Sequence, residues 1–139
     1  MYNRCPMSNI DLVKEVYTAF ARRDMNAILA KLSPDVVWGE PANPFNPAGG
    51  TRHGHVGFLE WARIGRDAED VEELAPQRFL ANEDSVAVVG HMRCRAKCTG
   101  RVYESDFVHL VVCLDGKIIL FQEFFDTHVA GEAFRSLSK

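Results

Sequence analysis

The first part of the chain carries apolar side chains at helical spacing. Behind Ser8 they recur every three or four residues, at Ile10, Val13, Tyr17 and Phe20. This period is typical of an amphipathic helix, and the run from Ser8 to Asp11 has the form of a capping box with Asp in place of Glu. The pattern therefore predicts a helix from this point to about Arg23.

A strand and two shorter helices are predicted next. Asp24 can cap a helix that ends at residues 33–35; its apolar side comprises Met25, Ile28, Leu29 and Leu32. Residues 36–38 (Val-Val-Trp) predict a short strand, and residues 41–51, with three prolines and two glycines, predict a loop. After Gly54 a third helix is indicated by the spacing of Phe58, Trp61, Ala62 and Gly65. The acidic stretch 67–73 is typical of a solvated connection.

The second half of the chain predicts strands. Four segments alternate with turn signals, one of them Asp115-Gly116; the segments are residues 77–81, 85–98, 101–114 and 117–126. Within 85–98 most even-numbered positions are apolar, whereas the odd-numbered positions from His91 to Lys97 are polar. One face of this strand should therefore pack inward, and the other should meet water or a partner. Residues 128–137 predict a short closing helix.

Helices followed by a meander of antiparallel strands form an α+β pattern. We expect three N-terminal helices packed on a curved, mostly antiparallel sheet, which gives a cone-shaped fold with an internal pocket. A chain of 139 residues suits one domain. We place this domain at residues 8–139 and expect residues 1–7 to be a flexible tail.

Composition restricts the partners and the location. With 16 basic and 19 acidic residues the formal net charge is −3, which does not favour nucleic-acid binding. No apolar run approaches the ~20 residues that span a bilayer, and no apolar stretch of signal-peptide length begins the chain. We therefore expect a cytoplasmic protein that binds neither nucleic acid nor membrane. Its four cysteines form no C-x-x-C pair, so we expect buried free thiols.

Four segments, taken in order, resemble one protein family. They are Tyr-x-x-Phe-x-x-x-Asp (17–24), Val-Val-Trp (36–38), Arg-His-Gly-His-Val-Gly-Phe (52–58) and Asp-Gly-Lys-Ile…Glu-Phe-Phe-Asp (115–126). Over about residues 8–135 the chain resembles the SnoaL-like branch of the nuclear-transport-factor-2-like superfamily. That group includes ketosteroid isomerase, polyketide cyclases, limonene-epoxide hydrolase and scytalone dehydratase. The resemblance implies the cone-shaped fold and a homodimer formed through the sheet, but no single activity, because one scaffold hosts many chemistries.

The resemblance also implies three candidate catalytic residues. Glu40, followed by Pro41, falls where ketosteroid isomerase has its proton-shuttling carboxylate, and His109 falls near that enzyme's protonated aspartic acid. Glu123 falls where the epoxide hydrolase has a catalytic carboxylate. The isomerase's oxyanion tyrosine aligns with Val16, so Tyr17, one residue further along, is expected on another side of the helix.

The residues themselves leave two interpretations of Glu40 and His109. Glu40 is either a carboxylate at the pocket mouth, whose pKa is raised by apolar neighbours so that it can act as a general base, or a solvated loop acid. His109 lies in a strongly apolar strand, where a histidine is either a satisfied core residue or a functional group of the pocket.

Glu123 alternates with Phe121 and Phe125 along the last predicted strand. A carboxylate among phenylalanines is costly unless it is paired or protonated. A three-residue loop at residues 115–116 would make His109 and Glu123 cross-strand neighbours on one face, and a two-residue loop would point them to opposite faces. Such a pair would be either catalytic or a structural pair that stabilises the core.

Further side chains are expected to line the pocket or to fill the core beneath it: Tyr17, Trp38, Phe58, Trp61, Met92, Phe121 and Phe125. His53-Gly-His55 with Glu60 resembles the first metal-binding motif of cupins, whose imidazole and carboxylate ligands suit Fe, Mn or Ni. The segment that follows has helical spacing and the second cupin motif is missing, so we expect no metal. The basic residues Arg93, Arg95, Lys97 and Arg101 should form a solvated outer face or a dimer contact.

These observations together predict a small-molecule enzyme that uses general acid–base chemistry without a cofactor. An isomerase, cyclase, dehydratase or hydrolase acting on a largely apolar substrate fits an aromatic-lined pocket with few ionisable groups. The alternative is a non-catalytic module of the same fold that binds a small apolar ligand or another protein.

Overall fold

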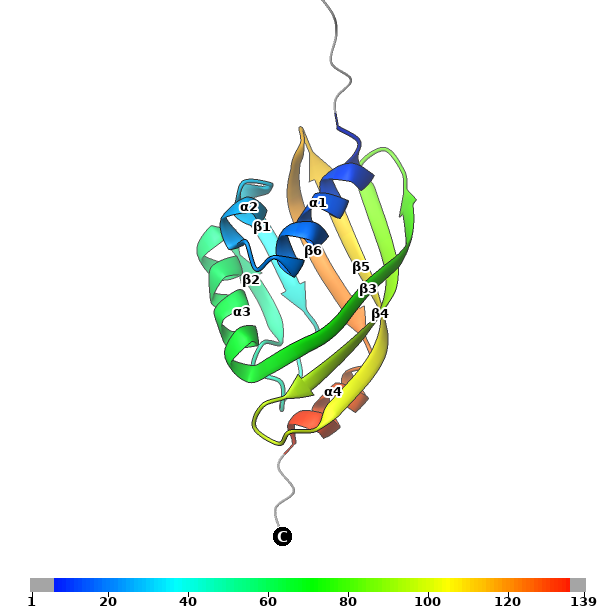
Figure 1. Ribbon diagram of the computed structural model, residues 1–139. Helices are drawn as coiled ribbons and strands as arrows, with labels where there is room; N and C mark the ends of the chain where they lie inside the picture. The colour runs from blue at the N-terminus through cyan, green and yellow to red at the C-terminus, as the bar shows by residue number, and fades with distance from the viewer. Residues whose placement is uncertain (1–6, 136–139) are drawn as a thin grey trace, which may run out of the picture.

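The computed structural model describes residues 7–135, so most of the predicted N-terminal tail and the end of the predicted closing helix lie outside the described residues. Four helices and six strands follow one another along the chain (Figure 1): α1 (Asn9–Ala21), α2 (Met25–Leu29), β1 (Leu32–Glu40), β2 (Gly50–His53), α3 (Gly54–Ala68), β3 (Glu69–Ala81), β4 (Ser85–Ala96), β5 (Val102–Leu114), β6 (Lys117–Phe125) and α4 (Thr127–Phe134). The predicted α+β class is confirmed. Within these residues no helix is long and apolar enough to cross a membrane.

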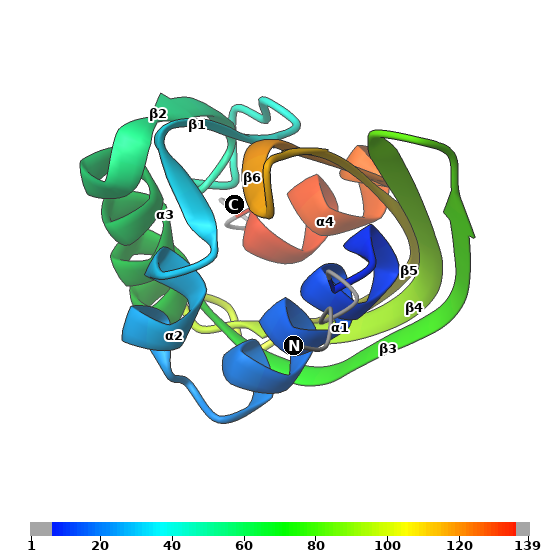
Figure 2. The same cartoon turned by 90° about the horizontal axis from the view of Figure 1, so that it is seen from above.

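All six strands belong to one mixed sheet with the order β2-β1-β6-β5-β4-β3. The pairing of β1 with β6 is parallel, and the other four pairings are antiparallel. The sheet curves around α1, and α3 lies against the end of the sheet formed by β1 and β2 (Figure 2). Antiparallel strands alternate their side chains between the two faces of a sheet, so apolar side chains can gather on one face. Helices cover that face of the curved sheet, and the other face remains open.

The helix caps and the strand alternation that the sequence predicts are present in the structure. The Ser8 hydroxyl accepts a hydrogen bond from the Asp11 backbone N–H at 3.1 Å, and Asp24 accepts one from Ala27 at the start of α2, also at 3.1 Å. These side chains satisfy backbone donors that a helix start leaves unpaired. In β4 the even-numbered positions from Val86 to Ala96 are buried and the odd-numbered ones are not, as the alternation predicts.

The acidic stretch 67–73 was expected to be a solvated connection, and this expectation is wrong. β3 begins at Glu69 and pairs with β4 along its length, starting with Glu69 opposite Ala96. Glu72 on β3 accepts hydrogen bonds from Arg93 and Arg95 on β4, at 2.9 and 3.2 Å. The acidic residues therefore form a strand because a basic neighbour from later in the chain compensates their charge.

Two other segments also differ from their expected structure. Residues 33–35, expected to end a helix, lie within β1, and the predicted loop 41–51 contains the start of β2. β2 pairs with the end of β1, with Gly50 opposite Glu40 and His53 opposite Val37. Both strands depend on partners distant in the sequence, which local composition does not reveal.

The hairpin between β5 and β6 determines which side chains share a face. Asp115 and Gly116 have positive φ values of 50° and 76° and form a two-residue loop, with Leu114 opposite Lys117. A two-residue loop alone would point His109 and Glu123 to opposite faces. Here a β-bulge leaves Ile119 without a partner, so that the register moves by one residue and His109 lies directly opposite Glu123.

Candidate active site

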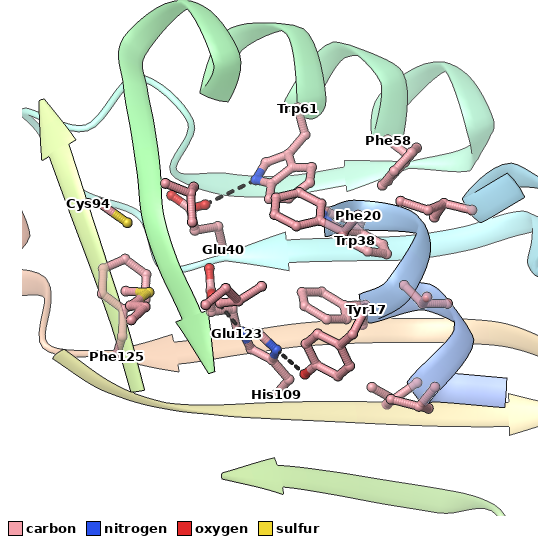
Figure 3. A pocket seen from close by; sticks show the side chains of 18 of the residues that line it. Tyr17, Phe20, Trp38, Glu40, Phe58, Trp61, Cys94, His109, Glu123 and Phe125 are labelled. Atoms are coloured by element: carbon pink, nitrogen blue, oxygen red, sulfur yellow. Dashed lines mark hydrogen bonds and ion pairs between the residues drawn. The ribbon is translucent and has the colours of Figure 1, made fainter. Parts of the chain in front are cut away.

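A cavity of about 80 Å³ lies between the helices and the concave face of the sheet. Its walls come from α1, α2 and α3 and from strands β1, β3, β4, β5 and β6 (Figure 3). All ten side chains that the sequence analysis selected line it: Tyr17, Trp38, Glu40, Phe58, Trp61, Met92, His109, Phe121, Glu123 and Phe125. The structure thus brings the selected residues together, while their roles in binding or catalysis remain predictions.

Three of these side chains form a hydrogen-bonded chain. The Tyr17 hydroxyl lies 2.6 Å from His109 Nδ1, and His109 Nε2 lies 2.6 Å from Glu123 Oε2. When Glu123 is ionised, Nε2–H donates to it, which leaves Nδ1 to accept from the tyrosine O–H. Burial and the charge of Glu123 raise the pKa of Tyr17, so this hydroxyl keeps its proton. These hydrogen bonds therefore connect the buried carboxylate of Glu123 to the Tyr17 hydroxyl in the cavity.

Tyr17 and Val16 show that two adjacent residues of α1 can both reach the cavity. Tyr17 lies one residue beyond Val16, on another side of the helix, and both residues line the cavity. α1 crosses the cavity, and adjacent helical residues are separated by only about 100° around the axis. A helix that covers a cavity can therefore direct two neighbouring side chains into it.

Glu40 lies at the end of β1 and is 6% exposed, which excludes the interpretation as a solvated loop acid. Trp61 Nε1 on α3 donates to its Oε1 at 3.0 Å, and Asn46 Nδ2 donates to its Oε2 at 2.8 Å. Burial first, and then the charge of Glu123, raise the pKa of Glu40 to about 8, although the two hydrogen bonds act in the opposite direction. Near neutral pH this carboxyl can both hold and release a proton.

Asn46 was not selected from the sequence, although it positions Glu40. It comes from the loop 41–49, and its Oδ1 accepts a hydrogen bond from the Ala48 backbone N–H at 3.0 Å. This bond fixes the amide orientation, so that Nδ2 is directed to the carboxyl of Glu40. The proline-rich composition of the loop predicted the absence of regular structure, but it gave no sign of a buried asparagine.

The sequence analysis also missed a second hydrogen-bonded carboxyl, that of Glu69, which pairs with the hydroxyl of Tyr103. Both residues line the cavity, and the Tyr103 hydroxyl donates to Glu69 Oε2 at 2.5 Å. Burial raises the pKa of Glu69 to about 7, the bond from Tyr103 lowers it, and the charges of Glu123 and Asp70 raise it. In the sequence Glu69 is one of five acids in residues 67–73, so composition does not distinguish it. A strand interpretation of this stretch would have placed Glu69 and Val71 on one face.

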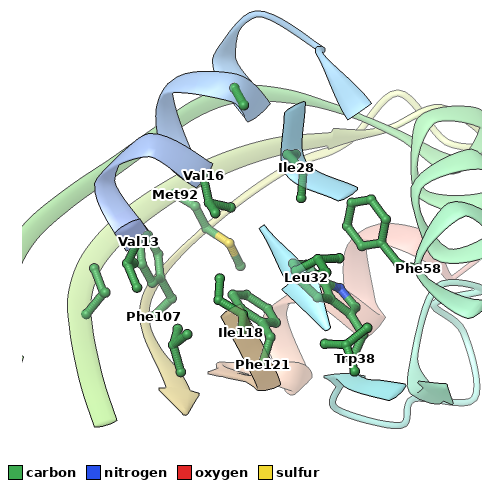
Figure 4. Packing of buried hydrophobic residues seen from close by; sticks show 14 of the residues in the cluster. Val13, Val16, Ile28, Leu32, Trp38, Phe58, Met92, Phe107, Ile118 and Phe121 are labelled. Atoms are coloured by element: carbon green, nitrogen blue, oxygen red, sulfur yellow. The ribbon is translucent and has the colours of Figure 1, made fainter. Parts of the chain in front are cut away.

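Aromatic rings form much of the cavity wall and join it to the core beneath (Figure 4). Trp38 stacks on Phe121 with ring centroids 4.0 Å apart and meets Phe58 edge to face at 4.6 Å. The Nε1–H of Trp38 is buried and has no hydrogen-bond partner among the described residues. A buried donor without a partner is costly unless a water or a ligand oxygen accepts from it.

The residues of the cupin-like motif have other contacts in the structure. Among residues 7–135 no three His, Cys, Asp or Glu side chains lie in an arrangement that could hold an ion. His55 Nε2 lies 3.0 Å from the backbone oxygen of Leu32, and Glu60 pairs with Arg52 at 3.7 Å. These contacts give two members of the cupin-like motif structural partners of their own.

Comparisons with known proteins agree with this architecture. An NTF2-like protein of unknown function from Burkholderia pseudomallei is 33% identical, with 94% of this chain and 100% of that chain covered and a TM-score of 0.83. An NTF2-like protein from Burkholderia xenovorans is 28% identical, with 91% and 95% covered and a TM-score of 0.84. TerC, co-crystallised with polyporic acid, is 30% identical, with 92% and 98% covered and a TM-score of 0.79. No curated protein sequence matches the chain. The family model of the SnoaL-like domain matches residues 13–121, and the chain therefore belongs to the SnoaL-like family.

Proposed function

We propose that the protein is a small-molecule enzyme that transfers protons with its own side chains, without a cofactor, on a largely apolar substrate with a carbonyl or hydroxyl oxygen. The observation that carries this proposal is the meeting of Glu40 and the Tyr17–His109–Glu123 chain in one aromatic-lined cavity. A pKa near 8 suits Glu40 to proton transfer near neutral pH. The buried Trp38 N–H offers a further donor for a ligand oxygen.

In the proposed reaction the ionised Glu40 takes a proton from the carbon next to a substrate carbonyl. The electrons of that C–H bond move toward the carbonyl oxygen, which accepts a hydrogen bond from Tyr17. For this step His109 carries a second proton and donates to the Tyr17 oxygen, and the charge of Glu123 balances the imidazolium. Glu40 then returns its proton to another carbon, which completes an isomerisation. Alternatively, Glu40 gives this proton to a hydroxyl on the next carbon, whose C–O bond breaks as the enolate electrons form a C=C bond, so that water leaves and a dehydration is complete.

The second candidate function is a non-catalytic module that binds an apolar ligand or another protein. It is supported by the 30% identity to TerC, a protein that was co-crystallised with polyporic acid. A binding module needs the cavity and its aromatic walls but does not need Glu40 to exchange protons. The two candidates therefore differ in what Glu40 does once a ligand is bound.

Proton exchange in D₂O distinguishes them without knowledge of the natural substrate. Apolar cyclic ketones such as 1-tetralone are incubated with the protein, and NMR follows the loss of the hydrogens next to the carbonyl. The wild-type protein should accelerate the exchange, and Glu40→Gln should reduce the acceleration about a hundredfold or more. Glu73→Gln, which changes an exposed carboxyl of β3, is the matched control and should retain it. Ketones that bind the wild-type protein without faster exchange would favour the binding module.

The proposal includes a homodimer formed through the outer face of the sheet. On that face Val108 of β5 is 37% exposed and Phe124 of β6 is 51% exposed, and the two residues are cross-strand partners. Arg93 and Arg95, on the outer face of β4, are already paired with Glu72. The apolar pair, rather than the arginines, is therefore the favoured dimer contact.

A further inference from the structure

The cavity contains a second polar group that the proposed reaction does not use. Glu69 is the first residue of β3, directly after α3, and it is held by Tyr103 near the start of β5. Tyr103 and His109 lie on the same inward face of β5, six residues apart. With a rise of about 3.3 Å per residue, their backbones are separated by ~20 Å along the strand. The Glu69–Tyr103 pair therefore lies at the start of this strand, and the Tyr17–His109–Glu123 chain lies at its middle.

The two carboxyls Glu69 and Glu40 differ in the number of protein donors that they meet. Both oxygens of Glu40 already accept from protein donors, Trp61 and Asn46. Glu69 accepts from Tyr103 through Oε2, and its Oε1 has no protein donor among the described residues. Because a carboxyl has acceptor sites on both oxygens, Glu69 keeps one oxygen for a ligand.

The charge of the cavity restricts which ligand groups Glu69 can meet. Its described lining includes three carboxyls and one histidine, but no lysine or arginine. The carboxyls repel one another, since the charge of Glu123 raises the pKa of both Glu40 and Glu69. A carboxylate or phosphate on the ligand would add to this repulsion. Neutral hydroxyl or carbonyl oxygens on the ligand would not add to this repulsion.

We propose that Glu69, positioned by Tyr103, binds a second oxygen function of the substrate, which is therefore a neutral compound with two separated oxygens on an apolar framework. This inference rests on the proposed function, because the first oxygen is the carbonyl oxygen that accepts a hydrogen bond from Tyr17 in the proposed reaction. Glu69 is then a binding residue that determines specificity, and Tyr103 is a positioning residue.

Naphthol and its dihydroxy analogues test the inference by binding. The dissociation constants of 2-naphthol and of 1,5-, 2,6- and 2,7-dihydroxynaphthalene are measured by ligand fluorescence. At least one dihydroxy isomer should bind the wild-type protein about tenfold more tightly than 2-naphthol, as expected for one added hydrogen bond. In Glu69→Ala this gain should disappear while 2-naphthol still binds. Glu73→Ala, the matched control on the same strand, should keep the gain, and 6-hydroxy-2-naphthoate should bind more weakly than the 2,6-diol.

Tyr103→Phe tests the positioning role through the pH dependence of binding, which a purely structural role of Tyr103 would not change. A hydroxyl donates more strongly to a carboxylate than to a carboxylic acid. The gain in affinity that the second hydroxyl provides should therefore rise with pH as Glu69 ionises near its pKa of about 7. Removal of the Tyr103 O–H removes a bond that lowers this pKa, so the rise should move to higher pH. The groups that share the surroundings of Glu69, namely Asp70, Glu40, Cys94 and Glu123, are unchanged in this variant.

The outcomes separate this inference from the proposed function. Equal affinity of the wild-type protein for 2-naphthol and for every dihydroxy isomer would overturn the inference and leave the exchange chemistry of Glu40 intact. A gain that persists in Glu69→Ala, with the variant shown by circular dichroism to be folded, would overturn it as well. Failure of the proposed function has a different signature, because the exchange of 1-tetralone would then be absent in the wild-type protein.

Discussion

Glu40 should make the protein less stable as the pH rises. Its pKa is raised from 4.5 to about 8 in the folded state. Between these two values the folded protein holds the proton and the unfolded chain does not, so unfolding releases it. By linkage, the free energy of unfolding then decreases with pH across this window. The stabilising effect of the bound proton is complete below the unfolded pKa and is lost as the pH rises through the folded one.

The size of the effect follows from the pKa values. One pKa unit corresponds to about 1.4 kcal/mol, so the rise from 4.5 to about 8 amounts to about 5 kcal/mol of unfolding free energy. Glu40 is 6% exposed, so little solvent screening reduces this figure. A domain of this size is stable by about 5–15 kcal/mol. The titration of this one carboxyl is thus a large part of the total.

Glu40→Gln isolates this contribution. At about pH 5 the variant should be ~1 kcal/mol less stable than the wild-type protein, because an amide NH₂ replaces one of the oxygens that accept from Trp61 and Asn46. At about pH 9 the order should reverse, and the variant should be more stable by about 3 kcal/mol, since the wild-type protein then buries a charge and loses about 4 kcal/mol between the two pH values. Urea unfolding followed by circular dichroism, repeated across this pH range, gives both values.

A matched control and a clear negative result complete the experiment. Glu73 is exposed on β3, and Glu73→Gln should follow the wild-type pH dependence. If the difference between Glu40→Gln and the wild-type protein does not change with pH, the burial of Glu40 does not raise its pKa. The reasoning that makes Glu40 a proton carrier would then be refuted.

The remaining predictions concern the buried pair, a close contact and the assembly. His109→Ala should lower the unfolding free energy by about 3–5 kcal/mol, because it leaves the buried Glu123 without its partner. Tyr17→Phe, which removes one hydroxyl, should cost only about 0.5–1.5 kcal/mol; equal losses in urea unfolding would contradict this account. Gly90→Ala should cost about 1–3 kcal/mol in the same assay, since its Cβ would meet the Phe107 ring and a backbone oxygen of β3, and an unchanged midpoint would show that the contact is not close. Light scattering should give a solution mass twice that of the chain, and a monomer mass would refute the dimer.

The parts of the fold that the sequence predicted are those that depend on near neighbours. Ser8 and Asp24 cap helices through backbone groups three residues away, and the alternation in β4 follows from one buried face. The start of β3 at Glu69 depends instead on β4, more than twenty residues later. The loop 41–51 and the connection 67–73 were therefore predicted where the structure has the start of β2 and the start of β3.

The residues of the candidate site likewise differ in whether the sequence around them or only the tertiary structure reveals them. Glu40, His109 and Glu123 could be selected through the resemblance to the SnoaL-like branch, and His109 and Glu123 also place a titratable group among apolar residues, which is costly without a functional or structural reason. Glu69 stands among other acids, and Asn46 has no titratable group and stands in a proline-rich loop, so neither carries that signal. Their burial is a consequence of tertiary packing, and only the arrangement of β3 and of the loop 41–49 around the cavity reveals it.

The bulge at Ile119 shows why the register of the site could not be read from the sequence. Ile118, Phe121 and Glu123 are all buried, yet strict alternation cannot place an even-numbered and two odd-numbered positions on one face. The change of parity therefore requires an extra residue between Ile118 and Phe121. All four residues from 118 to 121 are apolar, so the hydrophobic pattern is satisfied with or without the bulge. The pairing of His109 with Glu123 thus depends on packing against β1 and the core, which decides between two registers that the sequence pattern fits equally well.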